Sequence, residues 1–463
     1  ITEKNISNIT NFAVQWQSVH VADGSTALTA TAGKGYFIDT TSGAQTVNLP
    51  SLDDSTLGDT ILLKDFARQW AVNNVTMGSG SDNVTISGGT SNTVDLGNGS
   101  GILNVTNGNN NITMGSAIDN VTLSGGTNNI TTGGNDDQIT LSDGNNTVNS
   151  GARNDQLTIS GGTYNIDTES GNDQVTISGG NNTVATGNDN DTISASNGVN
   201  NINTGSGTDQ ITLTGGTNTV VTGNNDDTIN VSGGNNEIDT DSGIDQVVLT
   251  GGTNDVNTGA NGDTVTLSGG TETIDMGSGN DTVLAGSNLS AADTVNGGDG
   301  TGDTIEITSA LTDALTARLS NFEILEIKGG GGVTHDITGL TGLTSLKASG
   351  ALTGAVVITD LAEAAEVDIS AALGNDLTIN QINSAGGADT LTFDFSGSSF
   401  TTGGSVIAPN IETVTLKTSA SGAKTMSGGT FADATNVIIT ATGSNLIIND
   451  FTATNITALD ASS

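Results

Sequence analysis

The sequence has no cysteine and only 2 proline residues, and aromatic residues make up 3% of its 463 positions. Without cysteine, the chain has neither disulfide bonds nor thiolate metal ligands, which also suits an exported bacterial protein that stays unfolded until it is outside the cell. Only 10 Lys and Arg residues stand against 50 Asp and Glu residues, which gives a net charge of -40. This charge argues against nucleic acid and anionic membranes as partners and requires bound cations. No run of about 18 apolar residues exists, so we expect no membrane span.

The sequence also lacks the signatures of common enzymes. Its 2 histidines, His20 and His335, are far apart and neither lies in a His-Glu-x-x-His zinc motif. We find no Gly-x-Ser-x-Gly nucleophile elbow, no phosphate-binding loop of the Walker type and no cysteine nucleophile. Carboxylate pairs are abundant, but a glycosidase cleft normally adds aromatic platforms. We therefore expect that the chain is not an enzyme.

What the chain has instead is a nine-residue period. Every ninth residue from Val94 to Val283 is Val, Ile or Leu, without an insertion, and Val75 and Val84 precede this series. Low hydrophobicity with high net charge would otherwise suggest disorder, but disorder does not produce such regularity. No helix keeps a nine-residue period on one face, whereas a short strand followed by a tight glycine-rich turn does. The period therefore predicts a β-solenoid in which each turn buries one aliphatic residue.

A second period of eighteen residues appears two positions before each aliphatic residue. One set contains only Asp, from Asp119 to Asp281, and the interleaved set contains Asn at eight of ten positions, from Asn110 to Glu272. Asp and Asn are nearly equivalent as turn formers, so geometry alone would mix them on both edges. Two nine-residue halves therefore make one coil, and one edge of the coil requires negative charge.

Charge on one edge predicts bound calcium. Stacked coils lie ~4.8 Å apart, and unit like charges at this spacing repel by roughly 3–4 kcal/mol per pair at an effective dielectric constant of ~20. A Ca²⁺ ion between successive Asp turns reverses the sign of this interaction and accepts hard oxygen ligands, including turn carbonyls. The alternative is a solvated acidic edge with loosely held ions. The predicted ligands, including Asp82 before Val84 and Asp303 in a last, looser repeat, are Asp82, Asp119, Asp137, Asp155, Asp173, Asp191, Asp209, Asp227, Asp245, Asp263, Asp281 and Asp303.

The Asn edge has a different predicted role. Identical Asn side chains stacked at strand spacing can hydrogen-bond along the column as an amide ladder, and we expect no metal there. The Asn half of the coil usually ends in Thr, as at Thr132, Thr168 and Thr204. Rows of Thr are therefore expected to hydrogen-bond along that face.

These residues resemble a known family. The pattern Gly-Gly-x-Gly-x-Asp-x-aliphatic-x is similar to the repeats-in-toxin (RTX) nonapeptide of secreted bacterial proteins, and the nearest copies are residues 205–212 and 277–284. The resemblance covers roughly residues 75–307. It implies a right-handed parallel β-roll in which the Asp side chains and turn carbonyls bind Ca²⁺, and which folds only after export. Every second repeat here has Asn in place of Asp, so the implied calcium role is restricted to the Asp positions.

The flanking regions have other patterns. Residues 1–70 contain strand patterns at 46–49 and 60–64, loosely resemble small β-modules of phage fibres, and form either a cap on the roll or a separate mobile domain. Residues 309–321 predict a short helix capped by Ser309, because Leu311, Leu315 and Leu319 lie four residues apart. The irregular strand patterns that follow predict a β-solenoid or sandwich, and their phrases resemble the assembly regions of RTX-type surface-layer proteins.

We therefore predict an all-β chain in three parts: an N-terminal β module at 1–70, a calcium-binding β-roll at 71–307 and an irregular β-rich assembly domain with one short helix at 308–463. The function that fits is a non-enzymatic structural protein of the bacterial exterior, a calcium-stabilised subunit of a surface layer or filament. Its expected partners are other copies of itself and, as a further candidate, cell-surface polysaccharide. The alternatives are a fibre or decoration protein of a phage, and an adhesin segment.

Overall fold

The structure is a computed structural model that forms two compact units, Ile1–Thr222 and Gly223–Ser463, which are treated separately below. It describes residues 73–77, 80–87, 91–329, 331–382, 387–442 and 445–460, together with the backbone of seven short strands between Gln15 and Lys64. No helix in these described residues is long and apolar enough to cross a membrane. Within these residues the regular structure is all β, apart from one helical turn.

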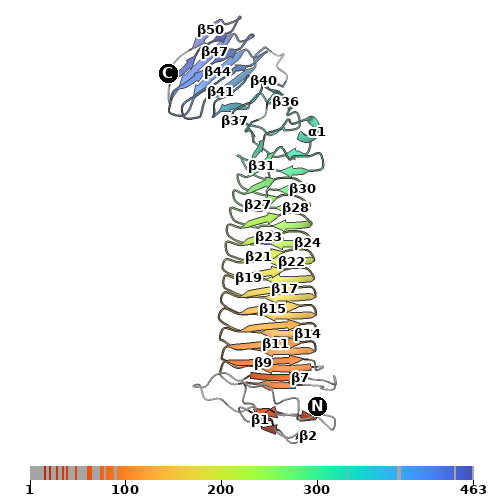
Figure 1. Cartoon of the computed structure of the whole chain (residues 1–463). Coiled ribbons are helices and arrows are strands. Elements are labelled where there is room, and N and C mark those ends of the chain that lie inside the picture. Colours follow the sequence, from red (N-terminus) through yellow and green to blue (C-terminus); the bar gives the residue numbers. More distant parts are fainter. Residues whose placement is uncertain are drawn as a thin grey trace. The chain divides into compact units, whose positions relative to one another are not determined.

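The first unit is a parallel β-solenoid with two stacks of strands (Figure 1). The aspartate-side sheet consists of the strands that follow the Asp positions, and the asparagine-side sheet consists of the strands that contain the Asn positions. Each strand pairs in parallel with the strand 18 residues further on, as Val121 does with Ile139 and Asn128 with Asn146. The aspartate-side strands are β9 (Asp82–Ser87), β11 (Gly101–Thr106), β13 (Asn120–Ser124), β15 (Gln138–Ser142), β17 (Gln156–Ser160), β19 (Gln174–Ile177), β21 (Thr192–Ala195) and β23 (Gln210–Leu213). The asparagine-side strands are β8 (Asn73–Thr76), β10 (Ser91–Asp95), β12 (Asn109–Thr113), β14 (Thr127–Thr131), β16 (Asn145–Asn149), β18 (Thr163–Asp167), β20 (Asn181–Ala185), β22 (Val199–Asn203) and β24 (Thr217–Val221).

The segment before the roll contains short parallel strands. Strand β7 (Thr60–Lys64) pairs with β9, so the predicted strand at 60–64 belongs to the aspartate-side sheet. Three further pairs join β1 (Gln15–Trp16) to β4 (Lys34–Gly35), β2 (His20–Val21) to β5 (Ile38–Asp39) and β3 (Leu28–Thr29) to β6 (Val47–Asn48). The side chains of this segment lie outside the described residues. Its predicted role as a cap or separate domain, and the domain boundaries, therefore stay predictions.

The aliphatic residues of the nine-residue period form the core of the coils. From Val94 to Val220 none of them exposes more than 1% of its surface, and those from Ile229 to Val283 in the second unit expose at most 2%. Burying one such side chain stabilises the fold by about 1.5–3 kcal/mol. The turns are tight: Gly133 has a φ angle of +104°, and a Cβ atom there would collide with the carbonyl oxygen of Gly115 in the preceding coil. Glycine is therefore required at this position.

The second unit is also a parallel solenoid, so its C-terminal part is a solenoid and not a sandwich. Its first strands keep the 18-residue step, as in Val247 to Val265, and later coils are longer, as in Leu325 to Leu346 and Val414 to Val437. The strands up to β34 are β25 (Thr228–Val231), β26 (Asn235–Asp239), β27 (Gln246–Leu249), β28 (Thr253–Asn257), β29 (Thr264–Leu267), β30 (Thr271–Asp275), β31 (Thr282–Gly286), β32 (Thr294–Asn296), β33 (Thr304–Ile307) and β34 (Leu319–Ser320).

The longer coils of the second unit have strands in three stacks. The first stack contains β35 (Ile324–Ile327), β37 (Ser345–Ala348), β39 (Glu366–Ile369), β41 (Thr390–Asp394), β44 (Thr413–Thr418), β47 (Asn436–Ala441) and β50 (Ala458–Asp460). The second contains β36 (Val333–Asp336), β38 (Val356–Leu361), β40 (Leu377–Gln381), β43 (Ser405–Ile407), β46 (Gly428–Thr430) and β49 (Phe451–Thr452). The third contains β42 (Phe400–Thr401), β45 (Lys424–Met426) and β48 (Leu446–Ile448).

The helix predicted at 309–321 is wrong in extent and in its cap. Helix α1 (Asp313–Thr316) is a single turn, and its N-cap is Thr312, whose side chain makes no capping hydrogen bond. Leu319 instead begins β34 and pairs with Val295. Leu311 and Leu319 are buried in the solenoid core, whereas Leu315, in the helical turn, is only half-buried.

Candidate metal centre: a buried aspartate ladder

The predicted calcium ligands all lie inside the coils. Each Asp from Asp119 to Asp303 comes directly before an aspartate-side strand and turns its side chain inward, and Asp82 is the first residue of β9. All 12 side chains expose 2% of their surface or less. In each unit they form a column along the solenoid axis, the aspartate ladder. The alternative of a solvated acidic edge is therefore wrong.

In most of these carboxyl groups, one oxygen holds neighbouring coils together. The backbone N–H of Asp119 donates to Oδ1 of Asp137 at 2.8 Å, and the N–H of Asp137 donates to Oδ1 of Asp155 at 2.8 Å. The same bond recurs in both units, at 2.7–2.9 Å, from Asp155 to Asp173, Asp173 to Asp191, Asp191 to Asp209, Asp227 to Asp245, Asp245 to Asp263, Asp263 to Asp281 and Asp281 to Asp303. Each of these positions therefore needs a short side chain with an oxygen acceptor as well as a charge, which the sequence pattern did not show.

The other oxygen of most of these groups is buried and accepts no hydrogen bond. This holds for Oδ2 of Asp119, Asp137, Asp155, Asp173 and Asp191 in the first unit, and of Asp245, Asp263, Asp281 and Asp303 in the second. The hydroxyl of Thr132 lies beside Asp137 but donates to the Ser150 carbonyl at 3.0 Å. A buried, unpartnered carboxylate oxygen costs several kcal/mol unless a cation or a proton neutralises it.

Burial also raises the pKa values of most of the ladder carboxyl groups, which favours a bound proton or cation. Burial raises the pKa of Asp119, Asp191 and Asp281 from the usual 3.8 to about 6, although a backbone N–H donor acts in the opposite direction in each case. Burial likewise raises the pKa of Asp137, Asp173 and Asp263 to about 7. Without a cation, these groups therefore take up protons near neutral pH. A divalent ion would keep them ionised, because it supplies the missing positive charge.

Oxygen atoms from neighbouring coils converge beside the ladder. A Cβ atom placed on Gly300 would lie 2.6 and 2.7 Å from the carboxylate oxygens of Asp303 and would also meet the carbonyl oxygen of Gly279. One on Gly279 would lie 3.0 Å from Oδ1 of Asp281 and would meet the carbonyl oxygen of Asn261. Carboxylate and carbonyl oxygens from neighbouring coils therefore crowd together at these turns, and both are ligands of the kind that Ca²⁺ accepts.

The turn carbonyls are available as ligands. Among the described residues, no backbone N–H donates to the carbonyl oxygens of Arg153, Asp189 or Asn261, which point toward the next coil. No three His, Cys, Asp or Glu side chains converge on one point in the described part of the chain. An ion in the ladder would therefore be held by one or two carboxylates and by several backbone carbonyls. These residues fit Ca²⁺ better than they fit Zn²⁺, which prefers nitrogen and sulfur ligands.

The ladder is interrupted near its start. The position between Asp82 and Asp119 is Gly101, where a Cβ atom would lie 2.8 Å from Cε of Met114 and 2.9 Å from Cδ1 of Leu96. Apolar side chains thus fill this corner, which Thr or Ser occupies in most later coils. Asp82 is buried but has no carboxylate in the next coil, so it is the weakest of the predicted ligands.

A further carboxylate continues the ladder. Oε2 of Glu323 accepts the backbone N–H of Asp303 at 3.0 Å, the bond that each Asp makes in the coils before it. Our sequence reasoning did not include this residue. The signal was its place directly before the strand pattern of residues 324–327, where Glu replaces Asp.

The predicted amide ladder is present on the opposite corner. Asn182 donates through Nδ2 to Oδ1 of Asn200 at 2.8 Å, and Asn200 donates to Asn218 at 2.7 Å. Asn110, Asn128 and Asn146 are linked in the same way, and in the second unit Asn236 donates to Asn254 at 2.8 Å. The predicted Thr rows also bond along the stack, as Thr168 Oγ1 donates to the Thr186 carbonyl at 3.2 Å.

The amide ladder of the second unit ends in two buried acids. Asn254 Nδ2 lies 3.4 Å from Oε1 of Glu272, and the backbone N–H of Glu272 donates to Oδ1 of Asp293 at 3.1 Å. Burial, with a hydrogen bond and repulsion from Asp293, raises the pKa of Glu272 to about 7. Glu272 therefore takes up a proton as the pH falls below about 7.

The histidines give no sign of a catalytic pair. His335 is 1% exposed, and its Nδ1 accepts the backbone N–H of Leu311 at 3.2 Å. Burial lowers its pKa to about 4, so it is neutral at physiological pH. His20 lies in β2, where side chains are outside the described residues.

Comparison with known proteins adds a fold neighbour. No protein-family model matches the chain, and no curated protein matches it. Among solved structures, the chain is similar to a crystal structure described as a hyperactive, Ca²⁺-dependent, β-helical antifreeze protein from an Antarctic bacterium. The match has 14% identity and a TM-score of 0.31, and it covers 72% of this chain and 88% of the other.

Proposed function

We propose that the chain is a non-enzymatic, extracellular structural protein, a subunit of a bacterial surface layer or surface filament whose coils are stabilised by Ca²⁺. The observation that carries this proposal is the aspartate ladder, with its column of buried carboxylates and unpartnered Oδ2 atoms. Such a column stays fully ionised at neutral pH only with cations between its rungs.

Calcium dependence suits a protein that folds outside the cell. Sites built largely from backbone carbonyls in extracellular modules bind Ca²⁺ with dissociation constants of roughly 10⁻⁴–10⁻³ M, so they fill where calcium is abundant. The chain would remain unfolded during export and become rigid afterwards. Stacked coils of one cross-section then form a stiff spacer, which is what a lattice or filament subunit needs.

Calcium removal tests this function. We expect excess EGTA to lower the β-sheet circular dichroism signal and the melting temperature of the purified chain, and added Ca²⁺ to restore both. Negative-stain microscopy with Ca²⁺ should show sheets or filaments. An unchanged melting temperature in EGTA would remove the support for the calcium ladder, and isolated monomers with Ca²⁺ present would count against assembly.

A further inference from the structure

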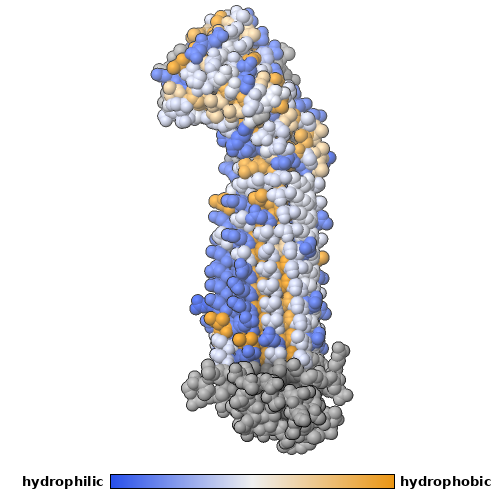
Figure 2. Space-filling model, in the orientation of Figure 1, coloured by the Kyte–Doolittle hydropathy of each residue, from blue (hydrophilic) through white to orange (hydrophobic). Residues whose placement is uncertain are grey.

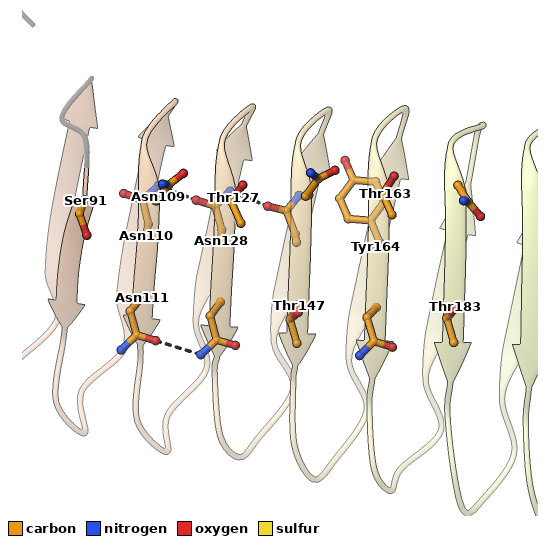
Figure 3. A pocket seen from close by; sticks show the side chains of 15 residues that line it. Ser91, Asn109, Asn110, Asn111, Thr127, Asn128, Thr147, Thr163, Tyr164 and Thr183 are labelled. Atoms are coloured by element: carbon orange, nitrogen blue, oxygen red, sulfur yellow. Dashed lines mark hydrogen bonds between the residues drawn. The ribbon is translucent and has the colours of Figure 1, made fainter.

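A groove runs along the outer surface of the asparagine-side sheet in the first unit (Figure 3). Two files of side chains border it, from the first and third positions of successive strands. One file runs from Ser91 to Asn181 and the other from Asn111 to Thr183, each in steps of 18 residues. We call this feature, with a volume of about 610 Å³, the outer groove. The space-filling view shows stripes of similar hydropathy that run along the stacked coils (Figure 2).

The outer groove has a fixed shape. Its floor is the backbone of the strands whose inward side chains, Asn110, Asn128 and Asn146, form the amide ladder. On its rim, Asn129 donates through Nδ2 to Oδ1 of Asn111 at 2.9 Å. Parallel strands repeat at ~4.8 Å, so both files offer hydrogen-bonding groups at one regular spacing. A partner would meet a preorganised surface and would lose little entropy on ordering it.

The chemistry of the groove is neutral. Every residue that lines it is Ser, Thr, Asn or Tyr, although the whole chain carries a charge of -40. Asn and Thr side chains each donate and accept hydrogen bonds, which matches a partner rich in hydroxyl groups. An acidic polymer would be repelled by the chain, and a basic one would be drawn to the acidic turns, for example to Asp136 and Asp189, rather than to this face. The ring of Tyr164 is 2% exposed and offers no stacking platform.

We propose that the outer groove binds an extended, uncharged glycan chain that lies along the solenoid axis and exchanges hydrogen bonds with successive coils. The inference deepens the surface-protein function proposed above, since it names the chemistry of a polysaccharide partner. Each coil contributes little binding free energy, and the affinity for the glycan increases with the number of coils that it contacts. Binding should therefore require a polymer, and short oligosaccharides should bind poorly.

The test compares two triple variants of the full chain with bound Ca²⁺. The first variant places one negative charge on every second coil of the outer groove, three in all, through Asn111→Asp, Thr147→Asp and Thr183→Asp. The matched control, Thr122→Asp, Thr158→Asp and Ser194→Asp, places three charges at the same spacing on the aspartate-side sheet. All six positions are exposed, so neither variant disturbs the core. Circular dichroism checks that both keep the wild-type fold.

Affinity electrophoresis in gels that contain a neutral glucan, galactan or mannan, or acidic alginate, measures binding. We expect at least one neutral polysaccharide to retard the wild type and the control variant equally, and the groove variant about tenfold less, because burying unpaired charge opposes contact. Alginate should retard none of them. The proposal is overturned if no neutral polysaccharide retards the wild type, or if both variants behave alike.

Two other occupants of the outer groove would give different results in experiments with these variants. Loss of self-association in the groove variant, with no effect on glycan retardation, would assign the groove to a second copy of the chain. Inhibition of ice recrystallisation by the wild type and not by the groove variant, without glycan binding, would assign it to ordered water. Either result overturns the glycan proposal. Neither affects the calcium test of the structural function, because all these proteins are compared in the folded, Ca²⁺-loaded state.

Discussion

At the scale of single residues, the aspartate ladder predicts that removing one of its charges stabilises the fold without calcium and destabilises it with calcium. Asp155→Asn keeps the acceptor for the N–H of Asp137 but removes one buried charge. In EGTA, we expect the variant to be more stable than the wild type, because one uncompensated carboxylate is gone. In Ca²⁺, it should be less stable by about 1–3 kcal/mol, because one charged ligand is missing. Urea denaturation in both buffers measures the two differences.

The control for this variant is Asp143→Asn, which removes the same charge from an exposed turn on the opposite edge. It should change the free energy of unfolding by less than about 0.5 kcal/mol in either buffer. Destabilisation of Asp155→Asn to the same extent with and without calcium would mean that Asp155 serves coil geometry alone.

The acid pair at the end of the amide ladder predicts a pH-dependent stability. The pKa of Glu272 is raised in the folded state from 4.5 to about 7, so the stability that its proton provides is fully present below about pH 4.5 and is lost as the pH rises through 7. Glu272→Gln removes the need for that proton and supplies an amide to the ladder. We expect this variant to melt at a higher temperature than the wild type at pH 8, and the difference to shrink or vanish at pH 5.

Melting curves from pH 5 to pH 8 at fixed calcium concentration measure this difference. Glu237→Gln is the matched control, since Glu237 lies in β26 with its side chain exposed. It should not alter the pH dependence. Parallel pH profiles for the wild type and Glu272→Gln would contradict the raised pKa of Glu272.

At the scale of elements, the turns on the aspartate side depend on glycine at particular positions. Gly133 has a φ angle of +104°, and an added Cβ would collide with the carbonyl oxygen of Gly115, whereas a Cβ on the neighbouring Gly134 would meet nothing within 4 Å. Gly133→Ala should therefore destabilise the first unit by at least about 1–3 kcal/mol, and Gly134→Ala should be neutral or slightly stabilising. Denaturation of both variants in Ca²⁺ gives the comparison, and equal effects would show that the turn adapts.

The elements also show what periodicity can and cannot predict. The nine-residue period placed the strands of the regular coils, because each coil repeats one backbone path, and the separation of Asp from Asn identified the two corners. It did not show that the Asp side chains turn inward, since Asp is usually exposed and the inward orientation depends on an N–H donor from the coil before. The C-terminal coils were harder to predict. The number of residues per coil differs, as the pairing of Leu325 with Leu346 and of Val414 with Val437 shows. No fixed sequence period therefore marks these coils.

At the scale of the whole molecule, the coil is the unit in which the chain can be shortened. Deleting residues 138–155 removes one strand of each sheet and joins Asp137 to Gln156, which follows Asp155 in the same way that Gln138 follows Asp137. Deleting only 138–146 shifts every later residue by half a coil. Asp155 and the Asp residues that follow it would then enter the asparagine corner, where the amides bond to each other and donate to turn carbonyls, as Asn128 does to Gly125.

We therefore expect the 18-residue deletion to fold, with the β-sheet signal of the wild type per residue and about one fewer bound Ca²⁺ per chain, because each coil adds one rung to the ladder. The nine-residue deletion should fail to fold cooperatively in Ca²⁺, because it buries charges without partners and leaves amides opposite carboxylates. Circular dichroism and equilibrium dialysis with calcium measure both outcomes. If the two deletion variants were equally stable, exchanging the aspartate and asparagine corners would not change the free energy of unfolding. Calcium binding could then not be the reason for Asp at one corner.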